Sequence, residues 1–149
     1  MDICFMKIDF ASYLDIDSWM ILVDKVKDLF PGLEMDEHRK TVIEFIERNE
    51  AICAKDGDKI VGTLLFSKEL NMICFLAVDP LYRRKHIAKE MIEYMLPLLD
   101  RNREVIVTTY REGDSKGFSA RAFYKNIGFK EGKLTEEFGY PVQEFLLKL

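Results

Sequence analysis

The strongest constraint on the fold is an apolar segment, residues 72–78, that leads through Asp79-Pro80 into a basic turn. The segment shows no alternation of apolar and polar residues, which predicts a strand buried on both faces. Pro80 has no backbone N–H for a ladder and disfavours helical geometry at Asp79, so the strand ends there. Such a strand is typical of the middle of a sheet that is covered on both sides.

The turn after this strand is unusually basic and leads into a helix. Arg83, Arg84, Lys85 and His86 follow one another, and the apolar residues after them recur at helical spacing: Ile87, Ala88, Met91, Ile92 and Met95. The first turn of a helix has unpaired N–H groups and partial positive charge, which basic side chains oppose and an anion satisfies. The sequence therefore predicts a phosphate site here. The alternative interpretation is a solvated basic turn.

Two motifs follow one another in roughly the second two-thirds of the chain. Residues 78–88 read VDPLYRRKHIA, and residues 120–129 read ARAFYKNIGF. Both resemble the GNAT superfamily of acyl-CoA-dependent N-acyltransferases. Its signature is Arg or Gln, two free positions, Gly, one free position and Gly or Ala after a strand, and its later motif is typically A-x-x-x-Y-x-x-x-G-F. Two positions depart: His86 stands where Gly is usual, and Gly117 where Asn is often found.

The resemblance implies one GNAT-like domain over residues 1–149, of α/β class (an α+β mixed sheet). We expect a central mixed β-sheet of about seven strands with helices on both faces. Local patterns agree, because apolar runs, caps and a hairpin signal at Asp56-Gly57-Asp58 give the order β, α, α, β, β, β, α, β, α, β, β. The first helix is expected to be capped by Asp17 or Ser18. The predicted strands are residues 3–8, 51–55, 59–66, 72–78, 104–110, 129–134 and 142–149.

The resemblance also implies an activity: transfer of an acetyl group from acetyl-CoA to a primary amine by direct attack in a ternary complex. Backbone groups of the central strand would pair with the pantetheine arm, and amides of the basic turn and helix start would hold the pyrophosphate. Side chains of the turn would add charge-assisted bonds. The residues assigned to the cofactor in this way are Leu76, Ala77, Val78, Arg83, Arg84, Lys85, His86, Ile87 and Ala88.

Tyr124 matches the family's general acid position. A phenol with a reference pKa of about 10 can protonate a departing thiolate, and the alternative interpretation is a buried aromatic. The general base stays open, because residues 72–78 contain no carboxylate. The candidates are Glu69, Glu112, Asp114, His38 and a water relay. Phe30, Phe138 and Tyr140 either line an acceptor pocket or belong to the core or an interface.

Composition narrows the class of partner. A net charge of -4 and a pI near 5.3 argue against nucleic acid, whose binding needs a basic face, and suit a cationic acceptor. We therefore expect a small-molecule or peptide amine as substrate, and a homodimer is possible under the resemblance. The alternative functions are a non-catalytic acyl-CoA-binding or sensing module and, more distantly, an unrelated α/β protein that binds a nucleotide or sugar phosphate.

The cysteines and the hydropathy pattern suggest a cytoplasmic protein without a metal. Cys4, Cys53 and Cys74 are scattered, lack metal-ligand spacing and fit a reducing compartment as core residues. Cys74 as a nucleophile is the less favoured interpretation, because no base accompanies it. The N-terminus lacks a signal-peptide pattern, and no apolar run approaches the roughly 20 residues of a membrane helix.

Overall fold

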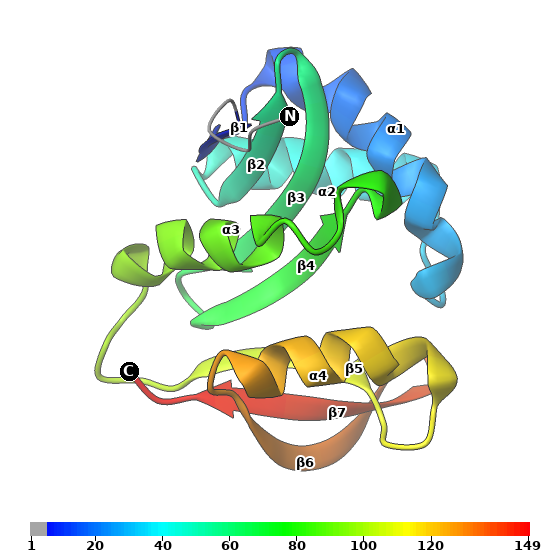
Figure 1. The fold of residues 1–149 in the computed structure, drawn as a ribbon, viewed down its shortest axis with the longest axis vertical. Coiled ribbons are helices and arrows are strands. Elements are labelled where there is room, and N and C mark those ends of the chain that lie inside the picture. The colour runs from blue at the N-terminus through cyan, green and yellow to red at the C-terminus, as the bar shows by residue number, and fades with distance from the viewer. Residues whose placement is uncertain (1–5) are drawn as a thin grey trace.

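The computed structural model describes residues 6–149, which fold into seven strands and four α-helices (Figure 1). The helices are α1 (Ile16–Val26), α2 (Met35–Glu47), α3 (Ile87–Met95) and α4 (Phe118–Asn126). The strands are β1 (Met6–Phe10), β2 (Ala51–Asp56), β3 (Lys59–Ser67), β4 (Met72–Val78), β5 (Val105–Tyr110), β6 (Lys130–Glu137) and β7 (Tyr140–Leu147). This order confirms the one predicted from the sequence.

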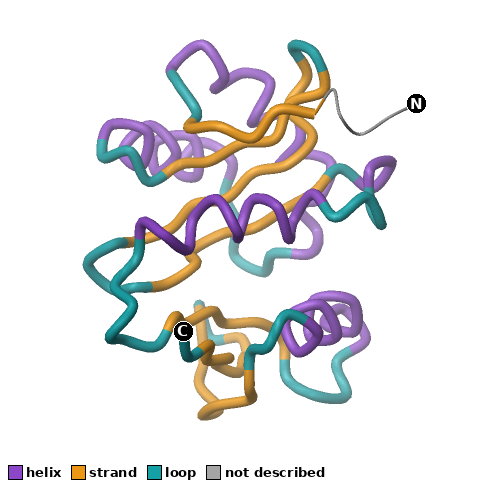
Figure 2. The backbone as a smooth tube through the Cα atoms, turned by 60° about the vertical axis from the view of Figure 1, so that its left-hand side comes forward, coloured by secondary structure: helices purple, strands orange, loops and turns teal. Residues whose placement is uncertain are grey.

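All seven strands form one sheet in the order β1-β2-β3-β4-β5-β7-β6. Neighbouring strands are antiparallel except β4 and β5, which are parallel and connected through α3. The mixed α/β sheet of seven strands is therefore confirmed. The N-terminal strands up to β4 and the C-terminal strands β5 to β7 form two parts that separate at the β4–β5 boundary (Figures 1 and 2).

Helices cover both faces of the sheet, as expected. α1 and α2 contribute Trp19 and Val42 to one buried apolar cluster, while α3 and α4 contribute Met91 and Tyr124 to the other. α3 approaches β3 closely because Gly62 has no side chain. A Cβ at Gly62 would lie 2.9 Å from both the Ile87 Cγ2 and the Met91 Cε atoms. The helix that starts at the basic turn is thus fixed directly against the sheet.

The first helix begins earlier than the sequence suggested. α1 starts at Ile16, so Asp17 and Ser18 lie inside its first turn and the expectation that one of them caps it is wrong. A short 3-10 turn precedes the helix, in which the Asp15 carboxylate accepts from the Ser12 N–H at 2.8 Å. This local bond competes with capping further along the chain. The expected strand 3–8 appears as β1, and its part before residue 6 lies outside the described residues.

β4 and β5 separate almost as soon as they meet. Their only paired residues are Met72 and Ile106, whereas β4 stays paired with β3 along its length. One residue of β4, Cys74, has no partner on β3 and forms a bulge. The prediction that both faces of β4 are buried is therefore wrong for much of the strand: Cys74 is exposed, and Leu76 and Val78 are half-buried. Leu76 and Val78 still pack against the apolar cluster under α3, while the backbone edge of β4 that faces β5 is open beyond Met72.

Asn71 closes the narrow end of this opening. The residue is fully buried, and its Oδ1 accepts from the Asp100 N–H at 2.8 Å. Its Nδ2 lies 3.1 Å from the Glu104 carbonyl oxygen and 3.2 Å from that of Asp100. The Asn71 carbonyl accepts from the Ile106 N–H at 3.1 Å. One side chain therefore ties the connection from α3 to β5 at the point where the sheet divides.

None of the helices within residues 6–149 is both long and apolar enough to cross a membrane. In the same part of the chain, His, Cys, Asp and Glu side chains do not gather in groups of three or more that could hold a metal ion.

Candidate active site

The carboxyl-terminal half of β4 presents an uncovered backbone edge. The Asp79 N–H donates to the Val61 carbonyl on β3 at 2.8 Å, and the register is regular from there back to Leu76. Backbone groups alternate in direction along an antiparallel strand. The N–H and C=O groups of Ala77 consequently point to β3, while those of Leu76 and Val78 point toward the opening left by β5.

Asp79 fixes the turn that follows this edge. Its side chain is buried, caps the 3-10 turn Pro80–Tyr82 by accepting from the Leu81 N–H at 3.0 Å, and lies 3.0 Å from the Lys25 Nζ atom. Burial raises the pKa of the carboxyl, but the Leu81 amide and Lys25 together outweigh it and lower the pKa below its usual value. Asp79 is therefore an ionised anchor of the turn, not a candidate base.

The basic turn brings two residues into left-handed geometry just before α3. Arg84 has a φ of 65° and His86 a φ of 61°, a conformation that Gly adopts without strain and that other residues adopt at a cost. The first intrahelical bond runs from the Glu90 N–H to the His86 carbonyl at 2.9 Å, so the amides of Ile87, Ala88 and Lys89 precede it and point out of the helix end. The basic turn thus leaves unpaired amides at the start of α3, where the sequence predicts a phosphate site.

The cationic side chains of the turn stay available. Arg83, Arg84 and His86 are exposed, Lys85 is half-buried, and none of the three Arg and Lys side chains forms an ion pair within residues 6–149. Arg84 faces α4 across an open groove whose other described walls are Ser119, Ala122, Phe123, Lys125 and Asn126. The groove therefore joins the basic turn to the helix that carries Tyr124.

Tyr124 lies in the core between α4 and the C-terminal strands. It is 5% exposed, and its ring centroid lies 5.4 Å from that of Phe129 and 6.1 Å from that of Phe145. Burial raises the pKa of the phenol well above its usual value, so Tyr124 keeps its proton at neutral pH. Within the described residues its hydroxyl has no hydrogen-bond partner, in contrast to the hydroxyls of Tyr82, Tyr110 and Tyr140.

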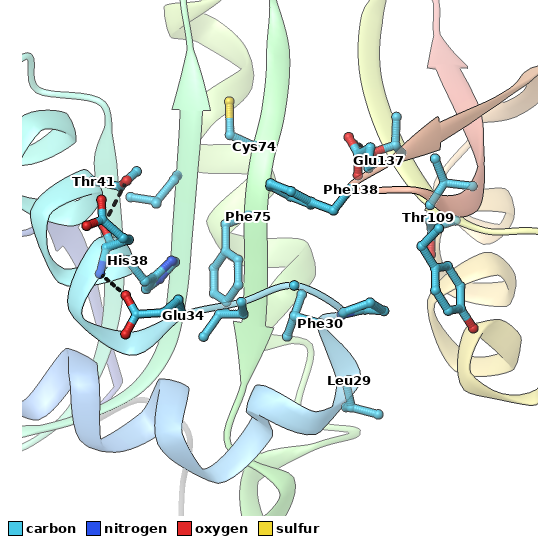
Figure 3. A pocket seen from close by; sticks show the side chains of 18 of the residues that line it. Leu29, Phe30, Glu34, His38, Thr41, Cys74, Phe75, Thr109, Glu137 and Phe138 are labelled. Carbon is cyan, nitrogen blue, oxygen red and sulfur yellow. Dashed lines mark hydrogen bonds between the residues drawn. The ribbon is translucent and has the colours of Figure 1, made fainter.

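A cavity of about 480 Å³ borders the split, the opening between β4 and β5, and lies between the α1–α2 connection and the β6–β7 hairpin (Figure 3). Phe30, Phe138 and Tyr140 all line it, which confirms that they surround a pocket. Phe75 of β4 forms its floor, with ring centroids 4.4 Å from Phe30 and 4.6 Å from His38. The centre of β4 thus borders this cavity with its side chains, and its open edge faces the split.

The sequence itself decides the family. A family model described as "Acetyltransferase (GNAT) domain" matches residues 47–131, more than half of the chain and the whole stretch from β2 to the basic turn and Tyr124. The chain belongs to the GNAT acetyltransferase family. No curated protein matches it significantly.

Solved GNAT structures share the fold over 95% to 97% of the chain. A GNAT-family acetyltransferase from Bacillus cereus is 21% identical with a TM-score of 0.72, the alignment covering 96% of each chain. Ard1 from Thermoplasma volcanium is 17% identical with a TM-score of 0.75, covering 95% of this chain and 96% of its own. The structure of the NatC complex bound to Gag peptide and CoA contains a chain that is 18% identical with a TM-score of 0.72. The alignment covers 97% of this chain and 98% of that one. At these identities the likeness concerns the fold.

Of the side chains named as possible bases of this GNAT domain, His38 is the one that lines the cavity. Its imidazole points inward (Figure 3), and its Nε2 is buried without a hydrogen-bond partner among the described residues. Burial lowers the His38 pKa below its usual value, which keeps the ring neutral at pH 7. Asp114 instead accepts from the Tyr140 hydroxyl at 2.6 Å, and Glu69 and Glu112 lie outside the lining.

Sequence reasoning missed Glu137, whose carboxylate lines the cavity and accepts from the Thr108 hydroxyl at 2.9 Å. It also placed Cys74 in the core, which is wrong: Cys74 is exposed at the β4 bulge and lines the cavity, whereas Cys53 is buried as expected. Cys4 lies outside the described residues. Although Cys74 is exposed as a residue, the protein atoms around its thiol desolvate it and, with the charge of Glu50, raise the Cys74 pKa to about 11. The thiol is therefore protonated at neutral pH, which disfavours it as a nucleophile.

The second departure from the GNAT pattern, Gly117, has a packing reason. A Cβ atom at this position would lie 2.6 Å from the Tyr110 Cβ, closer than side chains tolerate. The Tyr110 side chain is itself held across the split, because its hydroxyl donates to the Leu29 carbonyl. An Asn at residue 117 is thus incompatible with the present position of Tyr110. No spacing rule in the sequence signals this conflict.

Proposed function

We propose that this GNAT domain transfers the acetyl group of acetyl-CoA to a primary amine by direct attack in a ternary complex. The observation that carries the proposal is the position of the open β4 edge. It lies between the groove at the basic turn and the acceptor cavity, so two substrates can reach the same split from opposite sides. Acetyl-CoA is here a substrate, and the residues around the groove fit it.

The fit rests mainly on backbone groups. The outward N–H and C=O groups of Leu76 and Val78 can pair with the amides of a pantetheine arm, which then lies along β4 like an added strand. The free amides of Ile87 and Ala88 and the dipole of α3 favour the pyrophosphate. Arg83, Arg84 and Lys85 supply positive charge beside it, and His86 contributes its backbone at the turn.

In the chemical step, the amine nitrogen attacks the thioester carbonyl carbon, a C–N bond forms and the C–S bond breaks. A backbone N–H on the open edge of β4 stabilises the oxyanion. The leaving thiolate takes the proton of the Tyr124 hydroxyl and becomes the CoA thiol, and Tyr124 regains a proton from solvent. Burial raises the Tyr124 pKa, which keeps the phenol protonated before the reaction but also makes it a weaker acid, so the proton transfer depends on the hydroxyl lying close to the developing thiolate.

In this proposal the alkylammonium loses one proton to His38 before the attack, and His38 passes that proton to solvent. The nitrogen loses a second proton to solvent after the C–N bond has formed, which balances the proton that Tyr124 gives to the thiolate and regains from solvent. An alkylamine with a pKa of about 10 is almost entirely protonated at neutral pH and needs a neutral acceptor nearby. His38 supplies a neutral ring that lines the acceptor cavity, and a rotation of this side chain would bring its buried, unpaired Nε2 to the amine. Its ring also packs against that of Phe75 at an interplanar angle of 53°. These observations favour His38 over the three carboxylates considered with it.

Thiol release tests the proposal. The protein is mixed with acetyl-CoA and members of several amine classes, free thiol is followed over time, and the acetylated product is identified by mass spectrometry. We expect release above the rate without amine for at least one class. Calorimetric CoA binding with no release from any class would instead support the non-catalytic acyl-CoA-binding module.

A further inference from the structure

The charged side chains that line the acceptor cavity are all negative. Its lining includes the carboxylates of Glu34, Glu37 and Glu137, and no Lys or Arg belongs to its described lining. Lys40 lies 3.4 Å from Glu37 but is 70% exposed, which screens its charge. Glu34 also accepts two backbone N–H groups at the start of α2. A positively charged ligand is therefore attracted to the cavity, whereas a ligand carboxylate finds no cation to pair with it.

The walls between these charges are aromatic. Phe30 and Phe75 contact each other, and Phe138 points into the same space from the β6–β7 hairpin (Figure 3). The Phe138 side chain is 88% exposed, and its backbone has the unfavourable φ of 52°. The exposed Phe138 ring, together with the rings of Phe30 and Phe75, therefore offers apolar surface that a ligand can cover.

The cavity is also limited in length. The β6–β7 hairpin reaches the α1–α2 connection, where the Phe138 ring atoms lie 3.1 to 3.4 Å from the position that a Cβ on Gly32 would take. Tyr110 makes a second link by donating to the Leu29 carbonyl. A ligand between these links must be compact, and a volume of about 480 Å³ is within the range of small-molecule sites.

We propose that the acceptor is a small monoamine with an aromatic or branched apolar body and no carboxylate. This inference rests on the proposed acetyl transfer and narrows it. The ammonium group approaches through the acidic rim, the apolar body packs against Phe30, Phe75 and Phe138, and the amine nitrogen lies beside the His38 ring. A second ammonium, as in a polyamine, would have to enter the aromatic part and lose its hydration there.

A matched pair of amines provides the test. 2-Phenylethylamine and phenylalanine differ only in a carboxylate, so we expect kcat/KM for acetylation to be about 100-fold higher for the amine. Spermidine and a tetrapeptide with a free N-terminus complete the panel, and both are expected to react more slowly than 2-phenylethylamine. Binding of CoA is measured on the same protein by calorimetry.

Two variants with matched controls locate the effect. Phe138→Ala is expected to lower kcat/KM for 2-phenylethylamine about tenfold, while Phe118→Ala, also an exposed Phe but outside the cavity, leaves it unchanged. Glu137→Gln is expected to reduce the preference for 2-phenylethylamine over phenylalanine several-fold. Glu136→Gln, its neighbour on β6 outside the lining, leaves the preference unchanged.

The outcomes separate the two proposals. Faster acetylation of phenylalanine, spermidine or the peptide overturns the monoamine inference and leaves acetyl transfer intact. Thiol release from no amine, with CoA still bound, overturns both. A preference for 2-phenylethylamine that survives both Phe138→Ala and Glu137→Gln also contradicts the inference, because the selectivity would then come from elsewhere.

Discussion

The two sides of the β4–β5 split differ in the groups that they expose: one exposes mainly backbone groups and the other mainly side chains. On the cofactor side, Leu76, Val78 and the start of α3 offer backbone groups from one continuous stretch of chain. On the acceptor side, the cavity is made of side chains from α2, the α1–α2 connection, β4, β5 and the β6–β7 hairpin. A site made of backbone tolerates sequence change, whereas a site made of scattered side chains is redefined by each substitution. Under the proposed function, we therefore expect cofactor binding to be less sensitive to substitution than acceptor choice.

Tyr124 acts on the thiolate that forms between the two sides, so its replacement is expected to have the largest effect on activity. Tyr124→Phe is expected to lower kcat about 1000-fold because the leaving thiolate loses its proton donor. CoA affinity should change by less than twofold. The free energy of unfolding should change by less than about 0.5 kcal/mol, because the hydroxyl has no hydrogen-bond partner within residues 6–149. Stopped-flow turnover, calorimetry and urea unfolding measure the three quantities. Unchanged kcat would leave Tyr124 as a buried aromatic only.

His38 tests whether chemistry on the acceptor side depends on one side chain. His38→Gln is expected to lower kcat/KM about 100-fold at pH 7.5, because Gln cannot take the amine proton. In the wild type, activity should fall as the pH drops through the His38 pKa, which lies below the usual value of about 6.5. The pH–rate profile of the variant should lack this acidic limb. A limb that remains in the variant would assign the titration to another group.

The same residue predicts a pH dependence of stability. Burial lowers the His38 pKa in the folded state, so below about pH 6.5 the unfolded chain binds this proton more readily than the folded one. Unfolding free energy should therefore decrease as the pH falls from about 6.5, and less steeply in His38→Gln. Urea unfolding between pH 5 and pH 7 measures both slopes.

Arg84 tests how far the cofactor side depends on side-chain charge. Arg84→Glu is expected to weaken CoA binding about tenfold, more at low ionic strength because screening is then smallest. Lys133→Glu, which makes the same charge change on exposed β6, is the control and should have little effect. Calorimetry at two salt concentrations measures the difference. Equal effects of both variants would mean that net charge, not the position of Arg84, matters.

The smallest expected effect comes from His86→Gly, which tests whether backbone geometry rather than the imidazole defines the cofactor side. His86→Gly removes the strain of a φ of 61° but gives the unfolded chain more freedom, so we expect a net gain of about 0.5 kcal/mol in unfolding free energy. CoA affinity should be maintained or rise slightly. Differential scanning calorimetry with and without CoA measures both. A loss of CoA affinity would show that the imidazole itself contacts the ligand.

The sequence predicted the fold and the local geometry around the basic turn better than it predicted the lining of the cavity. The strand, turn and helix around Arg83–Ala88 form one local unit, so hydrophobic period and turn chemistry define it. The exposure of Cys74 could not be foreseen, because a strand beside an opening and a strand in a packed sheet have the same apolar pattern. Glu137 and His38 are about a hundred residues apart and meet only through the sheet order, which no local pattern encodes.

The single pairing of Met72 with Ile106 leaves the sheet incomplete beyond that point. Since Leu76 and Val78 have hydrogen-bonding groups without a strand partner, a ligand that pairs with them becomes a structural component for as long as it is bound. Its binding free energy then adds to the free energy of unfolding. We expect resistance of the folded domain to heat and proteases to follow the concentration of CoA compounds around it, so that metabolic state sets how long each molecule survives.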